Sequence, residues 1–269
     1  MPELPEIVVI AKQMDKILRK KEVQSVSITQ PKCGNRPVED YMKCLPGKKV
    51  ERVSPLGKWI EIVLDNQVRF LISLGMGGEI RYFKGAQTPP EKSRLIVRFS
   101  DETGFYVTLW WFGYFHLVLN QETHSMTDAL GPDPLNISED EFLSLLIKKR
   151  GNIKSFLLNQ KRIRGIGNFY IQEILFQAGM HPLREIDSIP EKEKRGLYRA
   201  TRKVLEQSIA LDSSSYELDF FGKKGKYGLD RMSIGYQEDK TCPVCRTKIR
   251  KIKTGSISQY ICPQCQTLS

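Results

Sequence analysis

Hydrophobic and polar positions follow two different periods along this 269-residue chain. After Pro5, which suits a first helical turn, apolar residues recur at helical spacing: Ile7, Ile10, Met14, Ile17 and Leu18. From residue 23 to about residue 119 the pattern changes to short β-rich runs separated by turn signals, at Val23–Thr29, Trp59–Leu64, Val68–Ser73, Leu95–Phe99 and Phe105–Trp110. Many short strands with close turns predict a β-sandwich or barrel rather than a parallel sheet.

Helical patterns dominate the second half of the chain. Gly131–Pro134 can continue neither a helix nor a strand, so we interpret it as a linker. Ser138 followed by Glu141 is a capping box, and the helix it starts is expected to reach about Lys149. Further helices are predicted at Asn152–Gln160, from near Asn168 to Gly179, and from Pro190 to about Leu211.

These patterns predict an α+β protein in four segments. Residues 1–128 form an N-terminal β-sandwich with a leading helix, and residues 129–137 form a linker. Residues 138–235 form a helical domain, and a segment at 213–236, rich in Gly, Ser and Lys, is expected to be a flexible loop. Residues 236–269 form a cysteine-containing finger.

Charge narrows the class of partner. Lys and Arg total 42 against 31 Asp and Glu, which gives a net charge of +11 and a pI near 9.3. Such an excess favours a polyanion, because each neutralised phosphate releases counterions, although a merely basic enzyme remains an alternative. No apolar run approaches the ~18 residues that a membrane span needs. The protein is therefore expected in a reducing, intracellular compartment, where cysteines seldom form disulfides.

Four of the six cysteines form one cluster at the C-terminus. Two Cys-x-x-Cys pairs, separated by sixteen residues, can place four thiolates around one structural Zn²⁺: Cys242, Cys245, Cys262 and Cys265. The alternating runs Lys248–Lys253 and Ser256–Ile261 predict a β-hairpin between the pairs. Its basic residues suit phosphate contacts, and a solvated basic face is the alternative. Cys33 and Cys44 stand apart as ordinary thiols.

The N-terminus carries candidate chemistry. Removal of Met1 leaves Pro2 with a free secondary amine, which can attack a sugar C1′ carbon and form an iminium. Glu3 and Glu6 offer carboxyl groups for proton transfer close to it. The alternative is an ordinary helix start with acids that favour the helix dipole. Farther on, the glycine turn Arg164–Asn168 opens a helix and could receive a phosphate on its backbone N–H groups, although a simple helix corner is the commoner use of such a turn.

Several short motifs occur together in a fixed order: Pro2–Glu6, Gly57–Lys58, Leu74–Met76, Leu130–Pro134, Gly165–Asn168 and the four cysteines. In this combination the chain resembles the formamidopyrimidine-DNA glycosylase and endonuclease VIII family over essentially its whole length. The resemblance implies a helix-two-turn-helix in the helical domain. It also implies a bifunctional base-excision enzyme, in which the terminal proline displaces a damaged base and the resulting Schiff base drives strand cleavage.

The resemblance assigns roles to particular residues. Pro2 is then the nucleophile, Glu3 protonates the opening sugar ring or the departing group, Glu6 assists, and Lys58 contacts the phosphate beside the lesion. Among the DNA-binding residues, Lys154 and Asn168 face phosphates, Met76 fills the hole left by the flipped nucleotide, and Trp110 and Phe112 lie in the DNA-reading segment. A core position is the alternative for Met76.

The chain departs from the family pattern at the DNA-reading positions. Ser73 stands where a histidine is common, and Asn159 replaces an aspartate. Each of the remaining departures stands where an arginine is expected: Trp110, Trp111, Gln237 and Ile257. In the family one arginine of the Trp110–Trp111 pair reads the base opposite the lesion, and the arginine at Ile257 grips the lesion phosphates. An apolar side chain cannot make that charge-assisted contact, and Lys253 or Arg250 are candidate substitutes.

These features predict a glycosylase and abasic-site lyase with altered substrate reading, in which two tryptophans either stack on a base or belong to the core. The alternative is a non-enzymatic or lyase-only paralogue that recognises abasic or distorted DNA. The expected partner is damaged DNA, duplex or single-stranded. We also expect a monomer in a bacterial-type cytoplasm, associated with the nucleoid and not with a membrane.

Overall fold

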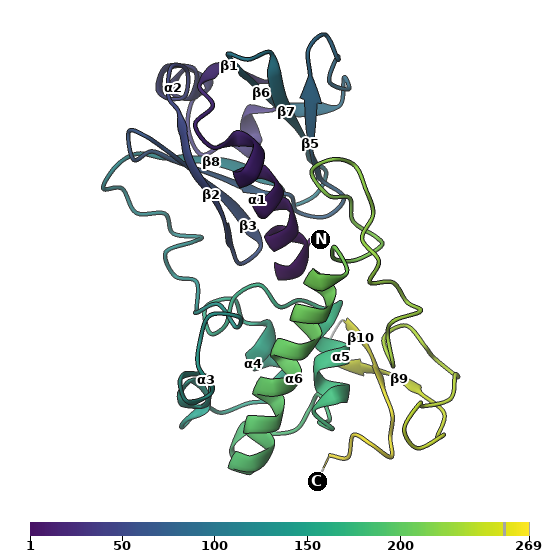
Figure 1. Ribbon diagram of the computed structural model, residues 1–269. Helices are drawn as coiled ribbons and strands as arrows, with labels where there is room; N and C mark the ends of the chain where they lie inside the picture. Colours follow the sequence, from purple (N-terminus) through teal and green to yellow (C-terminus); the bar gives the residue numbers. More distant parts are fainter. Residues whose placement is uncertain (255–256, 269) are drawn as a thin grey trace. The chain divides into compact units, whose positions relative to one another are not determined.

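The computed structural model describes residues 1–254 and 257–268, and it divides into two compact units (Figure 1). The first unit contains Met1–Asp128 together with Ser215–Gly225. The second contains Ala129–Ser214 and the chain from Lys226 onward. Each unit is built around apolar side chains of its own, so each is described separately.

Two four-stranded antiparallel sheets make up most of the first unit. One sheet has the order β1-β6-β7-β5, with strands Val23–Ile28, Ser93–Phe99, Thr103–Thr108 and Glu79–Lys84. The other has the order β2-β3-β4-β8, with strands Val50–Leu56, Trp59–Leu64, Arg69–Ser73 and Tyr114–Val118. The predicted β-sandwich is confirmed.

The buried side chains of this unit explain why the sheets form. In β6 every second residue is buried, so Leu95, Val97 and Phe99 face the core while the residues between them face outward. Helix α1, at Leu4–Leu18, buries its apolar stripe in the same core. The Asp15 carboxylate accepts a hydrogen bond of 2.7 Å from the Val53 N–H of β2, which fixes the helix against that sheet.

Some elements of this unit were not predicted. Strands β2, β5 and β8 and helix α2, at Val38–Cys44, lie in stretches with weak periodicity. Pro55 lies inside β2, which is an edge strand and so tolerates the missing N–H. The strand predicted at Phe105–Trp110 is β7, at Thr103–Thr108, so Trp110 lies beyond its end. A 3₁₀ turn covers Pro31–Cys33.

Residues 215–225 are anchored to the first unit. Phe220 is fully buried among the apolar side chains of the sandwich core. The Gln13 amide of α1 donates to the Asp219 carboxylate at 2.8 Å and accepts from the Phe220 N–H at 3.0 Å. The Phe220 carbonyl accepts from the Tyr82 N–H of β5 at 2.9 Å. This segment is therefore held between α1 and β5.

The second unit is mainly helical. Its helices are α3 at Glu139–Leu146, α4 at Ile153–Leu158, α5 at Tyr170–Gln177 and α6 at Glu191–Ala210, with a 3₁₀ turn at Ile186–Ser188. The capping box is confirmed, because the Glu141 N–H donates to the Ser138 hydroxyl and the Ser138 N–H donates to the Glu141 carboxylate. The helix ends at Leu146 rather than near Lys149, since Lys148 adopts a left-handed φ of 52°.

The turn between α4 and α5 is organised by one side chain. The Gln160 amide accepts from the Gly165 N–H at 2.8 Å and donates to the carbonyls of Leu158 and Ile166, each at 2.9 Å. These bonds hold the glycine turn against the end of α4. They provide the joint of the helix-two-turn-helix, which the resemblance implied.

The predicted hairpin is present as β9, at Arg250–Thr254, and β10, at Ile257–Ile261. Ser256, which began the second predicted run, lies outside the described residues. Among the described helices, none has both the length and the apolar composition needed to cross a membrane.

Candidate active site

The start of α1 holds the candidate nucleophile and its acids. Pro2 is buried, and the side chains of Glu3 and Glu6 are only 5% and 3% exposed. Glu3 is the N-cap residue, and its N–H donates to the Glu6 carboxylate at 2.8 Å. Glu6 therefore fixes the backbone one residue after Pro2, while Glu3 is the acid next to the proline in sequence.

The terminal ammonium also has a partner. The Met1 nitrogen lies 3.3 Å from a carboxylate oxygen of Glu217, in the segment anchored to this unit. Removal of Met1 makes the Pro2 nitrogen the chain terminus.

Lys58 lies in the tight turn that joins β2 to β3. Leu56 pairs with Trp59 across this two-residue turn, and Gly57 adopts a left-handed φ of 64°, which glycine takes without steric cost. The Lys58 side chain is half-buried. The paired strands on either side of this short turn hold the backbone of Lys58 in place, as a phosphate contact requires.

A buried imidazole pair supports that turn. His116 Nδ1 lies 2.8 Å from His124 Nε2, and His124 Nδ1 lies 2.8 Å from the Thr127 hydroxyl. Both rings pack against Trp59, the residue after Lys58. Burial, together with repulsion from His124, lowers the pKa of His116 to about 4. Burial also lowers the pKa of His124, so both rings are neutral near pH 7.

Met76 lies on a loop that is paired with the tryptophan segment. The Met76 N–H donates to the Trp111 carbonyl at 2.7 Å. Gly75, at φ 60°, makes this approach possible, because a Cβ there would lie 2.1 Å from the Trp111 carbonyl oxygen and 2.5 Å from the Gly113 nitrogen. Met76 itself is 44% exposed, so the core alternative for it does not hold.

Large aromatic side chains are displayed beside Met76. Trp110, Trp111 and Phe112 are 67%, 66% and 64% exposed, which also rules out the core alternative for the tryptophans. Phe112 adopts a left-handed φ of 57°, which is rare for a bulky residue and tends to persist where function requires it. The first unit therefore presents an apolar surface of four residues, which we call the aromatic loop surface: Met76, Trp110, Trp111 and Phe112.

The two phosphate-facing candidates in the second unit differ in exposure. Asn168 is exposed immediately before α5, and its carbonyl accepts from the Gln172 amide at 3.1 Å. Lys154, on α4, is only 4% exposed, and burial lowers the pKa of its ammonium. Asn168 is thus exposed and Lys154 is buried, and a role for either in DNA binding stays a prediction.

The register of the hairpin bears on the arginine missing at Ile257. Ile257 pairs with Thr254 and Lys253 pairs with Ser258, so Ile257 and Lys253 point to opposite faces of the ribbon. Arg250 shares the face of Ile257, but it pairs with Ile261, about 13 Å along the strand. Neither cation occupies the place of the missing side chain. Ile257 is 37% exposed.

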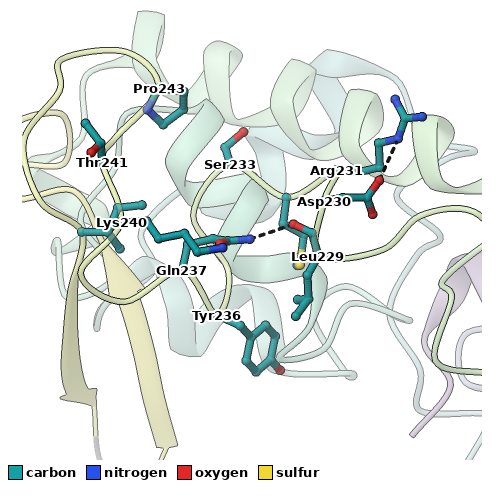
Figure 2. A pocket seen from close by; sticks show the side chains of 11 residues that line it. Leu229, Asp230, Arg231, Ser233, Tyr236, Gln237, Lys240, Thr241 and Pro243 are labelled. Atoms are coloured by element: carbon teal, nitrogen blue, oxygen red, sulfur yellow. Dashed lines mark hydrogen bonds and ion pairs between the residues drawn. The ribbon is translucent and has the colours of Figure 1, made fainter.

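Gln237, another departure, lines a surface hollow of about 630 Å³ in the second unit (Figure 2). Its side chain is 8% exposed and donates to the Leu229 carbonyl at 2.7 Å. It therefore serves the fold of residues 229–237 in this structure.

The four cysteines form the predicted metal centre. Their sulfur atoms all lie within 4.8 Å of one another, with 3.3 Å between Cys245 and Cys262 and 3.9 Å between Cys242 and Cys265. Four clustered thiols match the donor set of a closed, tetrahedral structural zinc site. One Zn²⁺ therefore holds the two Cys-x-x-Cys pairs at the base of the hairpin.

Three buried polar residues that the sequence reasoning missed join the finger to the helices. The Glu173 carboxylate of α5 accepts hydrogen bonds of 2.8 Å from the N–H groups of Ser233, Ile234 and Gly235. Gln172 accepts from the Tyr260 N–H at 3.1 Å, and Gln266 donates to the Met180 carbonyl at 2.8 Å. For Gln172 and Glu173 the available signal was an amide and an acid among the apolar residues of α5, but their partners are distant in sequence.

Comparison with known proteins agrees with this arrangement. The chain matches the family models of the formamidopyrimidine-DNA glycosylase N-terminal domain at residues 1–110, the H2TH domain of the same enzymes at residues 130–219, and the zinc finger found in FPG and IleRS at residues 239–268. The chain belongs to the formamidopyrimidine-DNA glycosylase family.

Relatives of this family match over nearly their whole length. Formamidopyrimidine-DNA glycosylases of Listeria innocua and Streptococcus pneumoniae are each 30% identical, over 99% of this chain and at least 99% of theirs. Among solved structures, a Lactococcus lactis Fpg variant in complex with Fapy-dG-containing DNA has a TM-score of 0.90 at 26% identity, and it covers 99% of this chain and all of that one. Lactococcus lactis Fpg with abasic-site DNA has a TM-score of 0.89, covering 98% and 99% of the two chains. The chain is thus a DNA-repair glycosylase of this family, with its DNA-binding fold and zinc finger.

Proposed function

We propose that this protein is a bifunctional base-excision enzyme that removes an oxidised base from DNA and then cleaves the strand through a Schiff base on Pro2. The observation that carries the proposal is the start of α1, where Glu6 fixes the backbone beside Pro2 and Glu3 follows the proline. The related Lactococcus lactis protein, solved with Fapy-dG and with abasic-site DNA, supports the same substrate class.

The chemistry follows from the residue types. The lone pair of the Pro2 nitrogen attacks C1′, and the bond from C1′ to the base breaks with its electrons leaving on the base. Glu3 supplies the proton that the opening sugar or the departing base requires. The ring bond from C1′ to O4′ then breaks, with its electrons leaving on O4′, and the Pro2 nitrogen forms a cationic iminium with C1′. The iminium acidifies the C2′ proton, so the 3′ phosphate leaves by β-elimination and the 5′ phosphate follows by δ-elimination. Glu6 acts as a positioning residue for Glu3 and Pro2.

DNA is held by contacts of two kinds. Lys58 and Asn168, with Lys154 as a further candidate, bind phosphates and give an affinity that falls steeply with salt. Met76 fills the space left in the base stack, while Trp110 and Phe112 belong to the segment that reads the DNA beside it. We further propose that the protein acts as a monomer on cytoplasmic, nucleoid DNA. Catalysis then belongs to residues 1–128, DNA binding to 138–235 and phosphate gripping to 236–269, with 129–137 as a linker.

Borohydride trapping tests the proposal. Met1-processed protein is incubated with a duplex that contains an abasic site, the adduct is reduced, and peptide mapping locates the modified residue. The expected adduct is on Pro2, and Pro2→Gly should slow trapping strongly without abolishing it, because a primary amine remains. If no abasic substrate gives an adduct, Pro2 is not a nucleophile. A binding paralogue, which the apolar Ile257 and Trp110 favour, is then the better function.

A further inference from the structure

A hollow of about 320 Å³ opens beside the aromatic loop surface in the first unit. Trp110 and Trp111 form one part of its wall together with Leu109. Lys92 and Arg94 form another part, beside the half-buried Cys33. The hollow thus combines two aromatic rings with two cations, all within one compact unit.

The cationic wall is firmly built. Lys92 precedes β6 and Arg94 is its second residue, and between them Ser93 donates to the Pro90 carbonyl through both its N–H, at 2.9 Å, and its hydroxyl, at 2.6 Å. Within the part of the chain that the structure describes, neither cation has an ion-pair partner. Two cations without ion-pair partners can neutralise an anion that enters the hollow.

The aromatic wall is equally defined. Trp110 lies against Gly77, where a Cβ atom would lie 3.7 Å from the indole, and the paired loop holds Trp111 by its backbone. Both indoles remain about two-thirds exposed, whereas Trp59, the third tryptophan of the chain, is 6% exposed. Exposed indoles on a fixed backbone offer stacking surfaces to a planar ring.

A nucleotide matches both walls at once. Its base has a π-face for the tryptophans, and its phosphate has the charge for Lys92 and Arg94. Trp110 stands where the family resemblance places the arginine that reads the base opposite the lesion. Met76 and Phe112 lie beside it, on the surface that would replace the lost base in the stack. By that resemblance, the nucleotide expected nearest this hollow is the one opposite the lesion.

We propose that the hollow binds the nucleotide opposite the lesion after it has left the base stack, with the base against Trp110 and Trp111 and the phosphate on Lys92 and Arg94. This inference deepens the proposed function and rests on it. Stacking reads no base edge, so the enzyme accepts lesions opposite any base. It favours those in mismatched DNA, where the opposite base is already unpaired and costs less to extrude.

Equilibrium binding tests the occupant directly. The probes are duplexes with a tetrahydrofuran abasic analogue opposite A, C, G, T or a second tetrahydrofuran. Affinities for the four bases should agree within about threefold, and the duplex without an opposite base should bind about tenfold more weakly, or about 1.4 kcal/mol. In Trp110→Ala/Trp111→Ala that tenfold difference should disappear. A marked preference for cytosine, or equal affinity without an opposite base, overturns the proposal.

Matched substitutions test the cationic wall. Arg94 and Arg98 lie on the same face of β6, but only Arg94 lines the hollow, while the Arg98 guanidinium lies 4.9 Å from the centre of the Phe83 ring. Arg94→Gln should weaken binding to every probe by a similar factor and reduce its salt dependence, whereas Arg98→Gln should not. Met42→Ala, on exposed α2, is the control for loss of an exposed apolar side chain. Equal effects of Arg94→Gln and Arg98→Gln count against the proposal.

Fluorescence and thiol protection separate this proposal from the catalytic one. Because Trp59 is buried, binding should quench the tryptophan signal only when an opposite base is present, and Trp110→Ala/Trp111→Ala should lose that quenching. In a Cys44→Ser background, bound DNA should slow alkylation of Cys33. Neither readout requires strand cleavage. If trapping fails while quenching is normal, only the Schiff base on Pro2 is rejected. If trapping is normal without quenching or thiol protection, only nucleotide binding in the hollow is rejected.

Discussion

The start of α1 and the aromatic loop surface belong to the same unit and differ in burial, bonding and charge. Pro2, Glu3 and Glu6 are buried, and the Glu6 carboxylate holds the backbone of the N-cap residue. Trp110 and Phe112 are about two-thirds exposed, and the family resemblance expects an arginine at Trp110. Residues that perform chemistry tolerate little change, because each atom must stay in place, whereas a surface that reads DNA can exchange charge for stacking.

The zinc hairpin in the second unit also exposes an apolar side chain where the family resemblance expects an arginine. Gln172 of α5 accepts from the Tyr260 N–H of β10, and Glu173 of α5 accepts from the N–H groups of residues 233–235, which precede the finger. At its exposed end Ile257 stands where a cation would grip phosphate, and Lys253 points to the opposite face. In both units buried contacts thus hold the scaffold, while exposed apolar side chains stand where the family resemblance expects arginine.

Glu3→Gln should give the largest change. Its base-excision rate should fall by about 100-fold or more, because general acids contribute factors of that order. Cleavage of a preformed abasic site should fall much less, since no base has to leave there. Single-turnover assays on the two substrates measure the difference. Equal losses on both would show that Glu3 does not protonate the departing group or the sugar.

Removal of one zinc ligand should show how much of the DNA affinity comes from the hairpin. Cys262→Ser should lower the zinc content from about one per chain to well below one and weaken DNA binding by more than about tenfold, because such sites contribute folding energy directly. Elemental analysis and a salt titration of affinity measure both effects. Cys44→Ser, outside the cluster, is the control. Unchanged affinity in zinc-free protein would remove the finger from the interface.

Ile257→Arg should strengthen DNA binding by the zinc hairpin. A charge-assisted hydrogen bond to phosphate contributes about 1.5–3 kcal/mol, so affinity for abasic-site DNA should rise by at least about tenfold and depend more steeply on salt. Ile257→Gln, which is polar but neutral, should give no such rise. If Arg and Gln behave alike, the side chain at this position does not face a phosphate.

Substitution in the His116–His124 pair, which packs against Trp59, should give the smallest effect, a change in how stability depends on pH. Burial holds the pKa of His116 at about 4 and lowers that of His124, whereas an unfolded histidine titrates near 6.5. Below pH 6.5 the unfolded chain therefore binds more protons, and stability should fall as the pH drops from 6.5 toward 4. Melting temperatures across this range should show a smaller fall for His124→Gln. An identical fall would mean that this pair does not control acid stability.

Strong local patterns were enough to predict much of the fold. The apolar stripe of α1, the Ser138–Glu141 box and the spacing of the four cysteines each carry their physical cause in adjacent residues, and all three are present. Strands β2, β5 and β8 were missed because their alternation is interrupted, as by Pro55 in β2, and they form by pairing with distant strands.

The candidate site was predicted unevenly for a similar reason. The sequence placed Pro2, Glu3 and Lys58 by motif, but it could not show that Glu6 bonds to the Glu3 backbone or that Lys154 is buried. It also left open whether the tryptophans are core residues, because exposure depends on the pairing of the Met76 and Trp111 loops. The hollow beside them joins three separate segments of chain, which no local pattern reveals.

The central claim is that the catalytic start is intact while the reading of the opposite base has changed. The most direct measurement is the rate of borohydride trapping by Met1-processed protein on four duplexes that carry an abasic site opposite A, C, G or T. The account predicts a Pro2 adduct with all four duplexes, at rates within about twofold of one another. No adduct with any duplex, or an adduct with cytosine alone opposite the site, would contradict it.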